Sequence, residues 1–353
     1  MSETVASALT RFEGLYPLIG NTPLLVVRYR YAGEERTLYA KAEQLNLTGS
    51  IKDRMALYVL ERAYKRGILG PGETIVEATS GNTGIAFAAV GRAIGHPVVI
   101  YMPDWLSEER KALIRSFGAE IHLVSAEDGG FLGSIDRARE FVDHNGGFLP
   151  SQFENDDNVE AHARHTAVEL WHQLSHEHVC LDAFVAGVGT GGTVMGVARY
   201  FERRDHGARV VGVEPASSPT LSTGVKLGTH RIQGISDEFV PPIVDRSRLS
   251  DIVAVDDGDA IIMAQRLAAQ LGIGVGISSG ANFLGAIRMQ LRLGPDAAVA
   301  TVFPDSNKQY LSTDLLREEP VEERYMAPKV ELLGVRAVGR VCGMCADAVP
   351  RGW

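Results

Sequence analysis

Short apolar runs alternate with longer amphipathic stretches along most of the chain from Thr37 onward. The short runs predict strands, and stretches with apolar positions three or four residues apart predict helices. Strands are predicted at residues 38–42, 75–78, 98–102, 121–124, 183–186, 210–213, 252–255, 274–277 and 299–303. Helices are predicted at residues 108–117, 134–144, 159–172, 192–203, 259–271 and 281–293. This alternation indicates an α/β protein with a largely parallel sheet.

Two parts of the chain depart from the alternation. Residues 215–248 are rich in Ser, Thr, Gly and Pro and only weakly periodic, so we interpret them as an active-site or lid segment. Residues 326–353 have lost the alternation and are predicted to form a tail that packs outside the core or stays mobile. The length of 353 residues suggests two domains.

The composition argues against several classes of protein. A formal net charge of −9 gives no reason to expect binding to nucleic acid or to an anionic membrane surface. The uncharged run 267–287 has the length of a membrane span, but its glycines and polar residues favour a strand, a turn and a helix start. Residues 1–14 lack the apolar core of a signal peptide.

Cysteine usage indicates a reducing compartment, because three cysteines in this length do not make a disulfide scaffold. Cys342 and Cys345 form a lone C-x-x-C pair near the end of the chain. Zinc needs about four ligands, and neither a second pair nor a histidine stands beside these cysteines. We therefore predict no metal site and interpret this spacing as incidental, with a redox pair as the alternative.

One lysine stands where a helix is predicted to begin. Apolar positions with helical spacing follow Lys52 up to Gly67, and Ser50 is a suitable N-cap. The helix dipole places partial positive charge in the first turn, which favours a neutral amine over an ammonium group. A neutral amine can form a Schiff base with an aldehyde cofactor. The alternative is an ordinary solvated lysine in a helix cap.

A hydroxyl-rich loop, Thr-Ser-Gly-Asn-Thr-Gly at residues 79–84, follows the predicted strand 75–78 and opens a helix that runs to Ile94. Its three hydroxyls, the Asn82 amide and the free N–H groups of the helix start are suited to bind a carboxylate. An N-cap with turn glycines is the simpler interpretation.

A glycine-rich loop, Gly-Val-Gly-Thr-Gly-Gly-Thr at residues 187–193, also joins a strand to a helix. Glycines let the backbone approach a phosphate, whose charge the helix N-terminus stabilises. However, Gly187, Gly189 and Gly192 also satisfy the G-x-G-x-x-G pattern, and Glu214 follows at roughly the 20-residue offset of a dinucleotide site. Taken alone, this segment predicts a nicotinamide-dependent oxidoreductase.

Other polar residues also stand at predicted strand ends. Ser278, in the segment 276–281, is suited to hydrogen-bond a pyridine nitrogen without protonating it, which favours expulsion of a leaving group from Cβ over transamination. Asp305 follows the strand 299–303 and would lie with Ser278 on the side of the site that faces the pyridine ring. Gln152 would add an amide donor. A plain serine N-cap at Ser278 is the alternative.

The motifs S-I-K-D-R, T-S-G-N-T-G, G-V-G-T-G-G-T and G-I-S-S-G, in this order, resemble the fold-type II pyridoxal-phosphate enzymes, in particular the cysteine synthase and cystathionine β-synthase family. The resemblance spans residues 15–313. It implies two α/β domains, each with a twisted, mostly parallel sheet flanked by helices. Residues 1–47 and 151–325 would form the larger cofactor-binding domain, and residues 48–150 a smaller, mobile substrate-binding domain. It also implies a cytoplasmic homodimer with pyridoxal 5′-phosphate as cofactor.

The same resemblance implies roles for individual residues. Lys52 would hold the cofactor as a Schiff base and move the Cα proton. The other cofactor contacts would come from Asn82, Gly189, Thr190, Gly191, Gly192, Thr193, Ser278 and Asp305. The substrate contacts would come from Thr79, Ser80, Thr83, Gln152, Gly234 and Asp237.

The implied reaction is β-replacement through an aminoacrylate intermediate, and the leading hypothesis is a cysteine synthase that joins sulfide to O-acetylserine. Cysteine synthases usually have glycine where Ser236 stands, and neither Asp237 nor Glu238 is expected there. Either carboxylate could activate water or a bulky thiol, giving a cysteine lyase that releases sulfide or an enzyme that condenses serine with homocysteine. A solvated loop tip is the alternative for both residues. A cofactor-binding protein that acts through a partner remains a third hypothesis.

Overall fold

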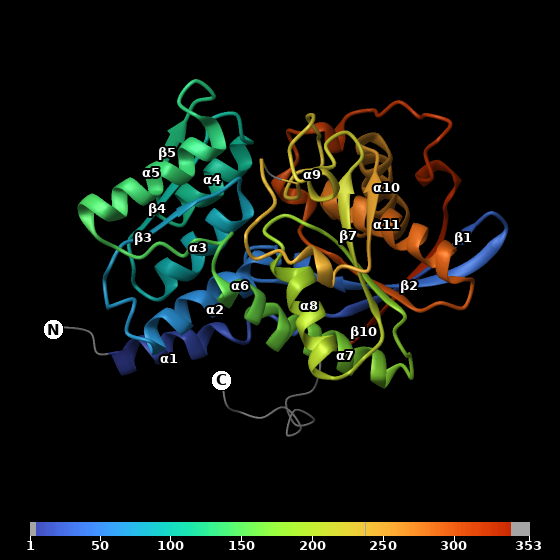
Figure 1. Ribbon diagram of the computed structural model, residues 1–353, viewed down its shortest axis with the longest axis horizontal. Helices are drawn as coiled ribbons and strands as arrows, with labels where there is room; N and C mark the ends of the chain where they lie inside the picture. Colours follow the sequence, from blue (N-terminus) through green and yellow to red (C-terminus); the bar gives the residue numbers. More distant parts are fainter. Residues whose placement is uncertain (1–4, 237, 340–353) are drawn as a thin grey trace.

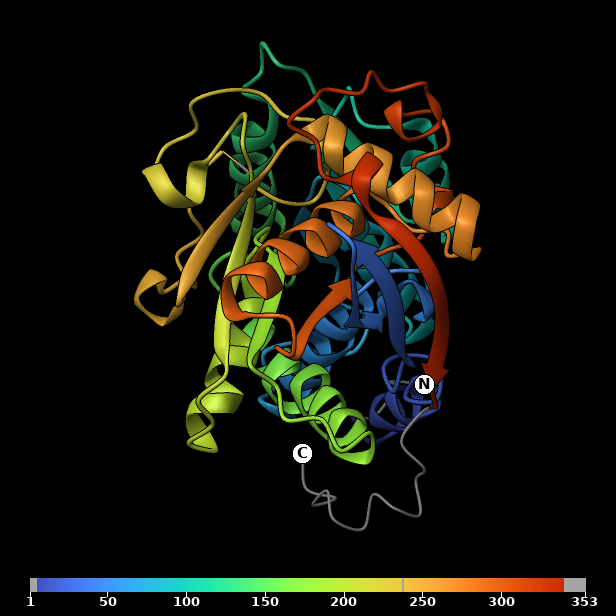
Figure 2. The same ribbon diagram turned by 90° about the vertical axis from the view of Figure 1, so that its right-hand side faces the viewer.

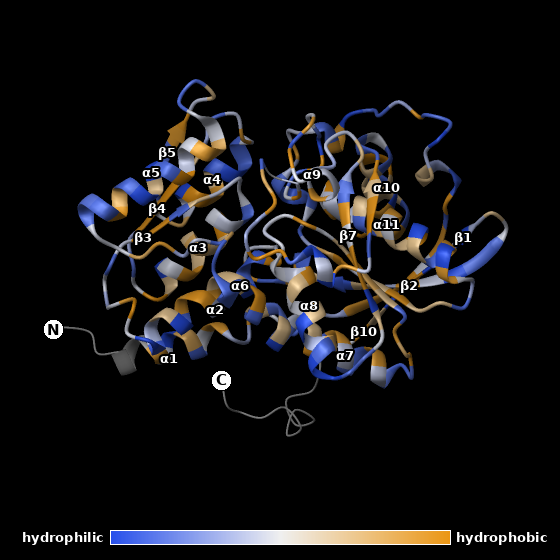
Figure 3. Cartoon of the chain, in the orientation of Figure 1, coloured by the Kyte–Doolittle hydropathy of each residue, from blue (hydrophilic) through white to orange (hydrophobic). Residues whose placement is uncertain are grey.

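The computed structural model describes residues 5–236 and 238–339, whose helices and strands build two separate sheets. Figure 1 shows the smaller sheet on the left and the larger sheet on the right, each flanked by helices. The α/β class with mostly parallel pairing is therefore confirmed. Figure 3 shows hydrophobic residues concentrated on the strands and on the inward faces of the helices.

The smaller sheet has three parallel strands, in the order β3 (Ile75–Ala78), β4 (Val98–Pro103) and β5 (Glu120–Val124). Every residue of β3 and β4 is buried, as expected for parallel strands covered on both faces. The helices that accompany this sheet are α2 (Lys52–Lys65), α3 (Asn82–Ala93), α4 (Glu108–Ser116) and α5 (Gly130–Asn145). Helix α1 (Val5–Leu15), which the predicted division assigned to the larger domain, packs through Phe12 and Leu15 into the core of α2 and α3.

The larger sheet has seven strands in the order β10-β1-β2-β9-β6-β7-β8. Their bounds are β10 Glu331–Val338, β1 Leu24–Tyr31, β2 Glu34–Ala42, β9 Val299–Phe303, β6 Ala183–Gly187, β7 Arg209–Pro215 and β8 Asp251–Val255. Strand β1 pairs antiparallel with both of its neighbours, and the pairs from β2 to β8 are parallel.

Helices cover both faces of the larger sheet. They are α6 (Asp156–Ala161), a π-helical turn (His162–Thr166), α7 (Ala167–His176), α8 (Gly192–Arg203), α9 (Thr220–Thr223), α10 (Asp257–Leu271) and α11 (Ile277–Leu293). Short 3₁₀ turns lie at Glu43–Leu45, Arg246–Arg248, Asn307–Gln309, Asp314–Leu316 and Ala327–Lys329. Because side chains alternate along a strand, Ala183 and Val185 pack with α10 and α11, while Phe184 and Ala186 pack with α7 and α8.

The predicted strand at residues 274–277 is wrong. Val275 forms only an isolated bridge with Ser306, and helix α11 already begins at Ile277. An ideal Cβ on Gly274 would lie 2.8 Å from Asn307 Oδ1, and one on Gly276 2.2 Å from Asp305 Oδ1. The run is thus pressed against the segment after β9, and a short apolar run cannot be distinguished from a helix start by its pattern.

The predicted single helix at 159–172 is also wrong, because α6, the π-helical turn and α7 follow one another there. Helix α8 approaches this turn closely: a Cβ on Gly196 would lie 2.5 Å from His162 Cβ. The ring nitrogen Nδ1 of His162 lies 2.9 Å from the Thr166 hydroxyl. Such a π-helical turn is a rare single-turn feature inside an α-helix, so a helical pattern alone does not predict it.

Part of the predicted tail belongs to the larger sheet. Strand β10 pairs with β1 and so covers the edge that β1 would otherwise expose, as Figure 2 shows. The Asp259 carboxylate accepts hydrogen bonds from the N–H groups of Met326 (2.9 Å) and Ala327 (2.7 Å). Cys342 and Cys345 lie outside the described residues. Within the described part of the chain, no helix is long and apolar enough to cross a membrane.

Candidate active site

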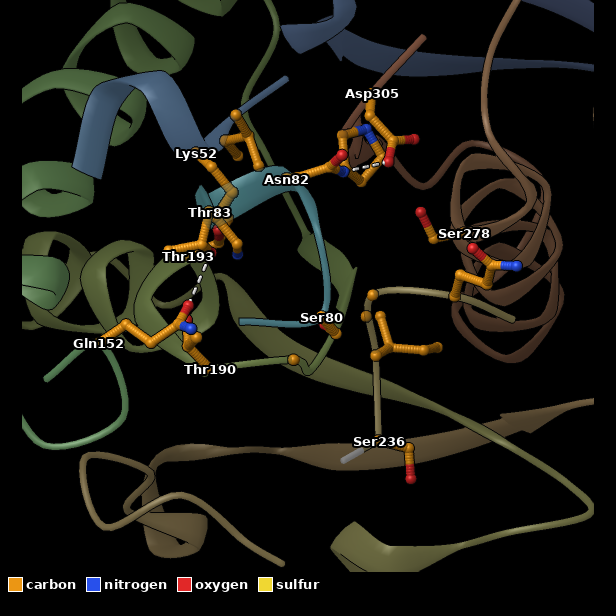
Figure 4. A pocket seen from close by; sticks show the side chains of 18 of the residues that line it. Lys52, Ser80, Asn82, Thr83, Gln152, Thr190, Thr193, Ser236, Ser278 and Asp305 are labelled. Atoms are coloured by element: carbon orange, nitrogen blue, oxygen red, sulfur yellow. Dashed lines mark hydrogen bonds between the residues drawn. The ribbon is translucent and has the colours of Figure 1, made fainter. Parts of the chain in front are cut away.

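Loops from both sheets meet in one pocket of about 220 Å³. Figure 4 shows the labelled side chains around this cavity. They come from the start of α2, the loop after β3 and the start of α3, the segment before α6, the loop after β6 and the start of α8, the 215–248 segment, the start of α11 and the segment after β9. Ligands of open α/β sheets bind at the carboxyl ends of the strands, as here. The predicted residues that line the pocket are Lys52, Ser80, Asn82, Thr83, Gln152, Gly189, Thr190, Gly191, Gly192, Thr193, Gly234, Ser278 and Asp305.

Lys52 is the first residue of α2 and is held there by the segment after β9. The Ile51 N–H donates to the Pro304 carbonyl at 2.8 Å, and the Ser306 N–H donates to the Gly49 carbonyl at 3.0 Å. The cap position is Ile51 rather than Ser50, although the Ser50 hydroxyl still accepts a hydrogen bond from the Lys52 N–H at 3.3 Å. The lysine amine thus stands at the positive end of a helix, as predicted.

The 79–84 loop is fixed by side chains. The Thr79 hydroxyl accepts hydrogen bonds from the N–H groups of Gly81 (2.9 Å) and Gly84 (3.3 Å). Thr79 is 1% exposed and is absent from the pocket lining, so its hydroxyl shapes the loop in this structure, and its contact with substrate stays a prediction. Ser80, Asn82 and Thr83 do line the pocket.

Gln152 supports the same loop through two side-chain hydrogen bonds. Its amide accepts a hydrogen bond from the Thr83 hydroxyl at 2.7 Å and donates one to the Ala78 carbonyl at 2.9 Å. The buried carboxyl of Glu77 accepts the N–H groups of Ala78 (2.9 Å) and Gln152 (3.3 Å). Burial raises the pKa of Glu77 to about 8, although these hydrogen bonds oppose the rise.

The 187–193 loop is fixed by close backbone approach. Gly191 caps α8 with a φ of +91°, a conformation that favours glycine. A Cβ on Gly189 would lie 2.3 Å from the Gly234 carbonyl oxygen, and one on Gly192 2.0 Å from Asn158 Oδ1. The Asn158 amide also donates to the Thr190 hydroxyl at 3.0 Å. The N–H groups of the first turn of α8, with the hydroxyls of Thr190 and Thr193, are suited to bind an anion.

The wall formed by α11 and the segment after β9 carries Ser278, Asp305 and Tyr310. Ser278 lies in the first turn of α11 and not at a strand tip. The Asp305 carboxylate accepts hydrogen bonds from Asn82 Nδ2 at 2.6 Å and from the Tyr310 hydroxyl. Burial raises the pKa values of both Asp305 and Tyr310. Asp305 therefore fixes the orientation of Asn82.

The opposite rim comes from the 215–248 segment. Lys226, His230, Gln233 and Glu238 line the pocket, and Lys226 Nζ lies 2.6 Å from Glu238 Oε1. Asp237 lies outside the described residues. Among the described polar residues of the pocket, sequence reasoning missed Arg110, Tyr310, Lys226, His230 and Gln233. In the rim segment it had singled out Gly234, Ser236 and Glu238.

Ser236 shows why glycine is usual at its position. Its φ is +55°, a left-handed conformation that is costly for a residue with a side chain. The Ser236 hydroxyl donates to the Ser218 carbonyl at 2.9 Å, and its carbonyl accepts His230 Nε2 at 2.9 Å. These hydrogen bonds offset the strain and hold the loop against the pocket.

Comparisons with known proteins give the class of this protein. The family model for pyridoxal-phosphate-dependent enzymes matches residues 15–305. Cysteine synthase of Staphylococcus aureus is 40% identical over 303 residues, which cover 86% of this chain and 96% of that protein.

Solved structures agree with this class. A hydrogen sulfide-producing enzyme from Fusobacterium nucleatum is 54% identical with a TM-score of 0.92, covering 94% of this chain and 100% of that one. Cysteine synthase from Entamoeba histolytica is 33% identical with a TM-score of 0.80, covering 90% and 93%. The chain therefore belongs to the pyridoxal-phosphate-dependent enzyme family, in its fold-type II cysteine synthase branch. It is an enzyme that catalyses β-replacement or β-elimination with pyridoxal phosphate, as the resemblance predicted.

The pocket fits that cofactor. Asn82 Oδ1 and Asp305 Oδ1 are buried without a hydrogen-bond partner among the described residues, and such oxygens are costly unless a ligand satisfies them. A lysine amine, a helix N-terminus with two threonine hydroxyls, and a serine hydroxyl face the same cavity. These groups suit an aldehyde, a phosphate and a pyridine nitrogen respectively. Among the described residues, no cluster of His, Cys, Asp and Glu could hold a metal ion.

Proposed function

We propose that the protein releases hydrogen sulfide from L-cysteine, with water taking the place of the sulfide or with simple elimination. The observation that carries the proposal is the greater likeness to the hydrogen sulfide-producing enzyme than to the cysteine synthases compared above. Cysteine synthesis from O-acetylserine and sulfide is the second candidate, favoured by the identity to the S. aureus enzyme.

The rim loop supports sulfide release. Ser236 and Glu238 both line the pocket, and Asp237 stands between them in the chain. A carboxylate at this rim is suited to take a proton from an attacking water molecule, which cysteine synthesis does not require. Glu238 is already engaged by Lys226, which leaves Asp237 as our preferred base.

We assign the remaining roles as follows. Bound pyridoxal phosphate supplies an electron sink for the α-carbon of an attached amino acid. Lys52 would hold the cofactor and move the proton at that carbon, the α8 N-terminus would anchor its phosphate, and Ser278 would face its ring nitrogen. Asn82 would touch its ring hydroxyl, while Ser80, Thr83, Gln152 and Gly234 would orient the substrate. Walls from both sheets would keep bulk water from the reacting atoms, apart from the one water molecule activated at the rim.

We also propose that residues 48–150 close over the substrate, and that the enzyme works as a cytoplasmic homodimer. Closure is supported by the position of the pocket, which takes residues from both sheets. The low cysteine count supports a reducing compartment.

The test is a comparison of two assays on the same preparation. With L-cysteine alone we expect sulfide together with serine or pyruvate; with O-acetylserine plus sulfide we expect cysteine at a lower kcat/KM. The Asp237→Asn variant should lose most sulfide release but keep cysteine formation, and Glu238→Gln is its matched control. Robust cysteine formation without sulfide release from cysteine would establish the second candidate instead.

A further inference from the structure

Arg110 is a buried cation in the pocket wall to which neither the sequence motifs nor the proposed function assign a role. It lies on α4, is 3% exposed, and lines the cavity. Its Nε is buried without a hydrogen-bond partner among the described residues. Burying a guanidinium costs free energy, so the contacts of Arg110 indicate its role.

The guanidinium contacts both halves of the site. Its Nη1 donates to the Ser80 carbonyl at 3.3 Å, and its Cζ lies 4.7 Å from the centroid of the Tyr310 ring. Ser80 belongs to the loop after β3 in the smaller sheet, and Tyr310 follows β9 in the larger one. Arg110 therefore joins the carboxylate-binding loop to the cofactor wall.

At the first contact, Arg110 helps to hold one peptide group. The carbonyl of the Ser80–Gly81 peptide accepts from Arg110, and its N–H donates to the Thr79 hydroxyl at 2.9 Å. Gly81 has a φ of +146°, and a Cβ there would lie 2.5 Å from Arg110 Cδ. The peptide plane, and with it the direction of the loop's donors, is thus fixed from both sides.

The contact of Arg110 with the Tyr310 ring connects to the same loop through a series of side-chain hydrogen bonds. The Tyr310 hydroxyl donates to Asp305, and the Asp305 carboxylate accepts Asn82 Nδ2 at 2.6 Å. Asn82 is the first residue of α3, directly after Gly81. The loop is therefore tied to Arg110 at Ser80 directly and at Asn82 through Tyr310 and Asp305.

We propose that Arg110 is the positioning residue of the carboxylate-binding loop. It holds the Ser80–Gly81 peptide in its strained conformation, and its charge favours the carboxylate of the incoming amino acid. The inference goes beyond the proposed function, because every amino-acid substrate presents the same carboxylate whatever its β-substituent.

The first test titrates the holoenzyme with two ligands that carry no leaving group, L-alanine and L-alaninamide, and follows the cofactor absorbance. In Arg110→Met we expect the dissociation constant of alanine to rise at least about tenfold, the loss of one charge-assisted hydrogen bond, with alaninamide changed less than about twofold. Arg110→Lys should recover part of the alanine affinity. Arg115→Met, an exposed arginine on the same helix, should behave like wild type. Wild-type alanine affinity in Arg110→Met, or equal weakening of both ligands, would overturn the proposal.

The second test does not depend on turnover. Amide hydrogen exchange of a peptide covering residues 78–84 should be faster in Arg110→Met and unchanged in Arg115→Met, because the tethered peptide has lost one of its supports. If Arg110→Met does not fold, Arg110→Gln, a smaller disturbance, should give the same result. Wild-type exchange in a folded Arg110 variant would disprove the positioning role even if sulfide release proves to be the activity.

Discussion

The two glycine-containing loops at the site have similar sequence signatures and are held in different ways. The 187–193 loop is fixed because its glycines lie against the Gly234 carbonyl and the Asn158 side chain. The 79–84 loop is fixed by the side chains of Thr79, Gln152, Arg110 and Asp305. A backbone cradle suits a phosphate that stays bound, whereas a loop held by side chains can rearrange when a substrate arrives and leaves. This difference predicts which substitutions weaken cofactor binding and which weaken substrate binding.

The largest effect is expected at the residue that both loops surround. Replacing Lys52 by Ala removes the amine that we propose holds the cofactor and moves the Cα proton, so kcat for sulfide release should fall about 10³-fold or more. Steady-state assays with cysteine measure this loss. Exposed Lys65 at the far end of the same helix is the control, and Lys65→Ala should retain wild-type turnover.

The next effect concerns the 187–193 loop, which close backbone approach holds in place. In Gly192→Ala the new methyl group must displace Asn158, which also supports Thr190. We expect the dissociation constant of pyridoxal phosphate to rise about tenfold and the free energy of unfolding to fall by about 1–3 kcal/mol. Titration of the cofactor-free enzyme and urea denaturation measure these changes. Gly207→Ala, where nothing lies within 4 Å of the added Cβ, should alter neither.

A smaller effect is expected at the side-chain-held loop. Thr83→Val removes the donor to Gln152 and leaves a buried amide oxygen unpaired. The KM for cysteine should rise about tenfold because the loop loses its support, while cofactor affinity stays within about twofold. The opposite pattern, with lost cofactor affinity and normal KM, would contradict the division of work between the loops.

The smallest effect is a pH dependence of the free energy of unfolding, caused by the buried carboxyl of Glu77. The pKa of Glu77 is raised to about 8 by burial, so the folded protein keeps a proton that the unfolded chain loses near pH 4.5. The resulting stability is fully present below about pH 4.5 and is lost as pH rises towards 8. Glu77→Gln cannot lose a proton, so between pH 5 and pH 8 its stability should fall less than that of wild type, by on the order of 2 kcal/mol. Urea denaturation at both pH values checks this, and parallel pH profiles of the two proteins would refute it.

Local signals account for what the sequence predicted well. Lys52 at a helix start and the glycine loops after strands depend on neighbours in the chain, and both lie where those patterns indicated. The hydrogen bonds of Thr79 to its own loop could not be predicted, since sequence does not tell whether a loop hydroxyl faces a ligand or its own backbone.

Long-range contacts account for what the sequence could not show. Arg110 belongs to an ordinary amphipathic helix and is distinguished by its contacts with Ser80, 30 residues earlier in the chain, and Tyr310, 200 residues later. Strand β10 is likewise predicted as part of a tail, because it lies beyond the alternating part of the chain and its pairing partner β1 lies near the other end of the chain.

The central claim is that the pocket around Lys52 holds pyridoxal phosphate on that amine. The most direct measurement is mass spectrometry of peptides from holoenzyme reduced with borohydride, which makes the bond between cofactor and amine permanent. The account predicts a phosphopyridoxyl group on Lys52. The same group on another lysine, or an unmodified chain after incubation with excess cofactor, would contradict it.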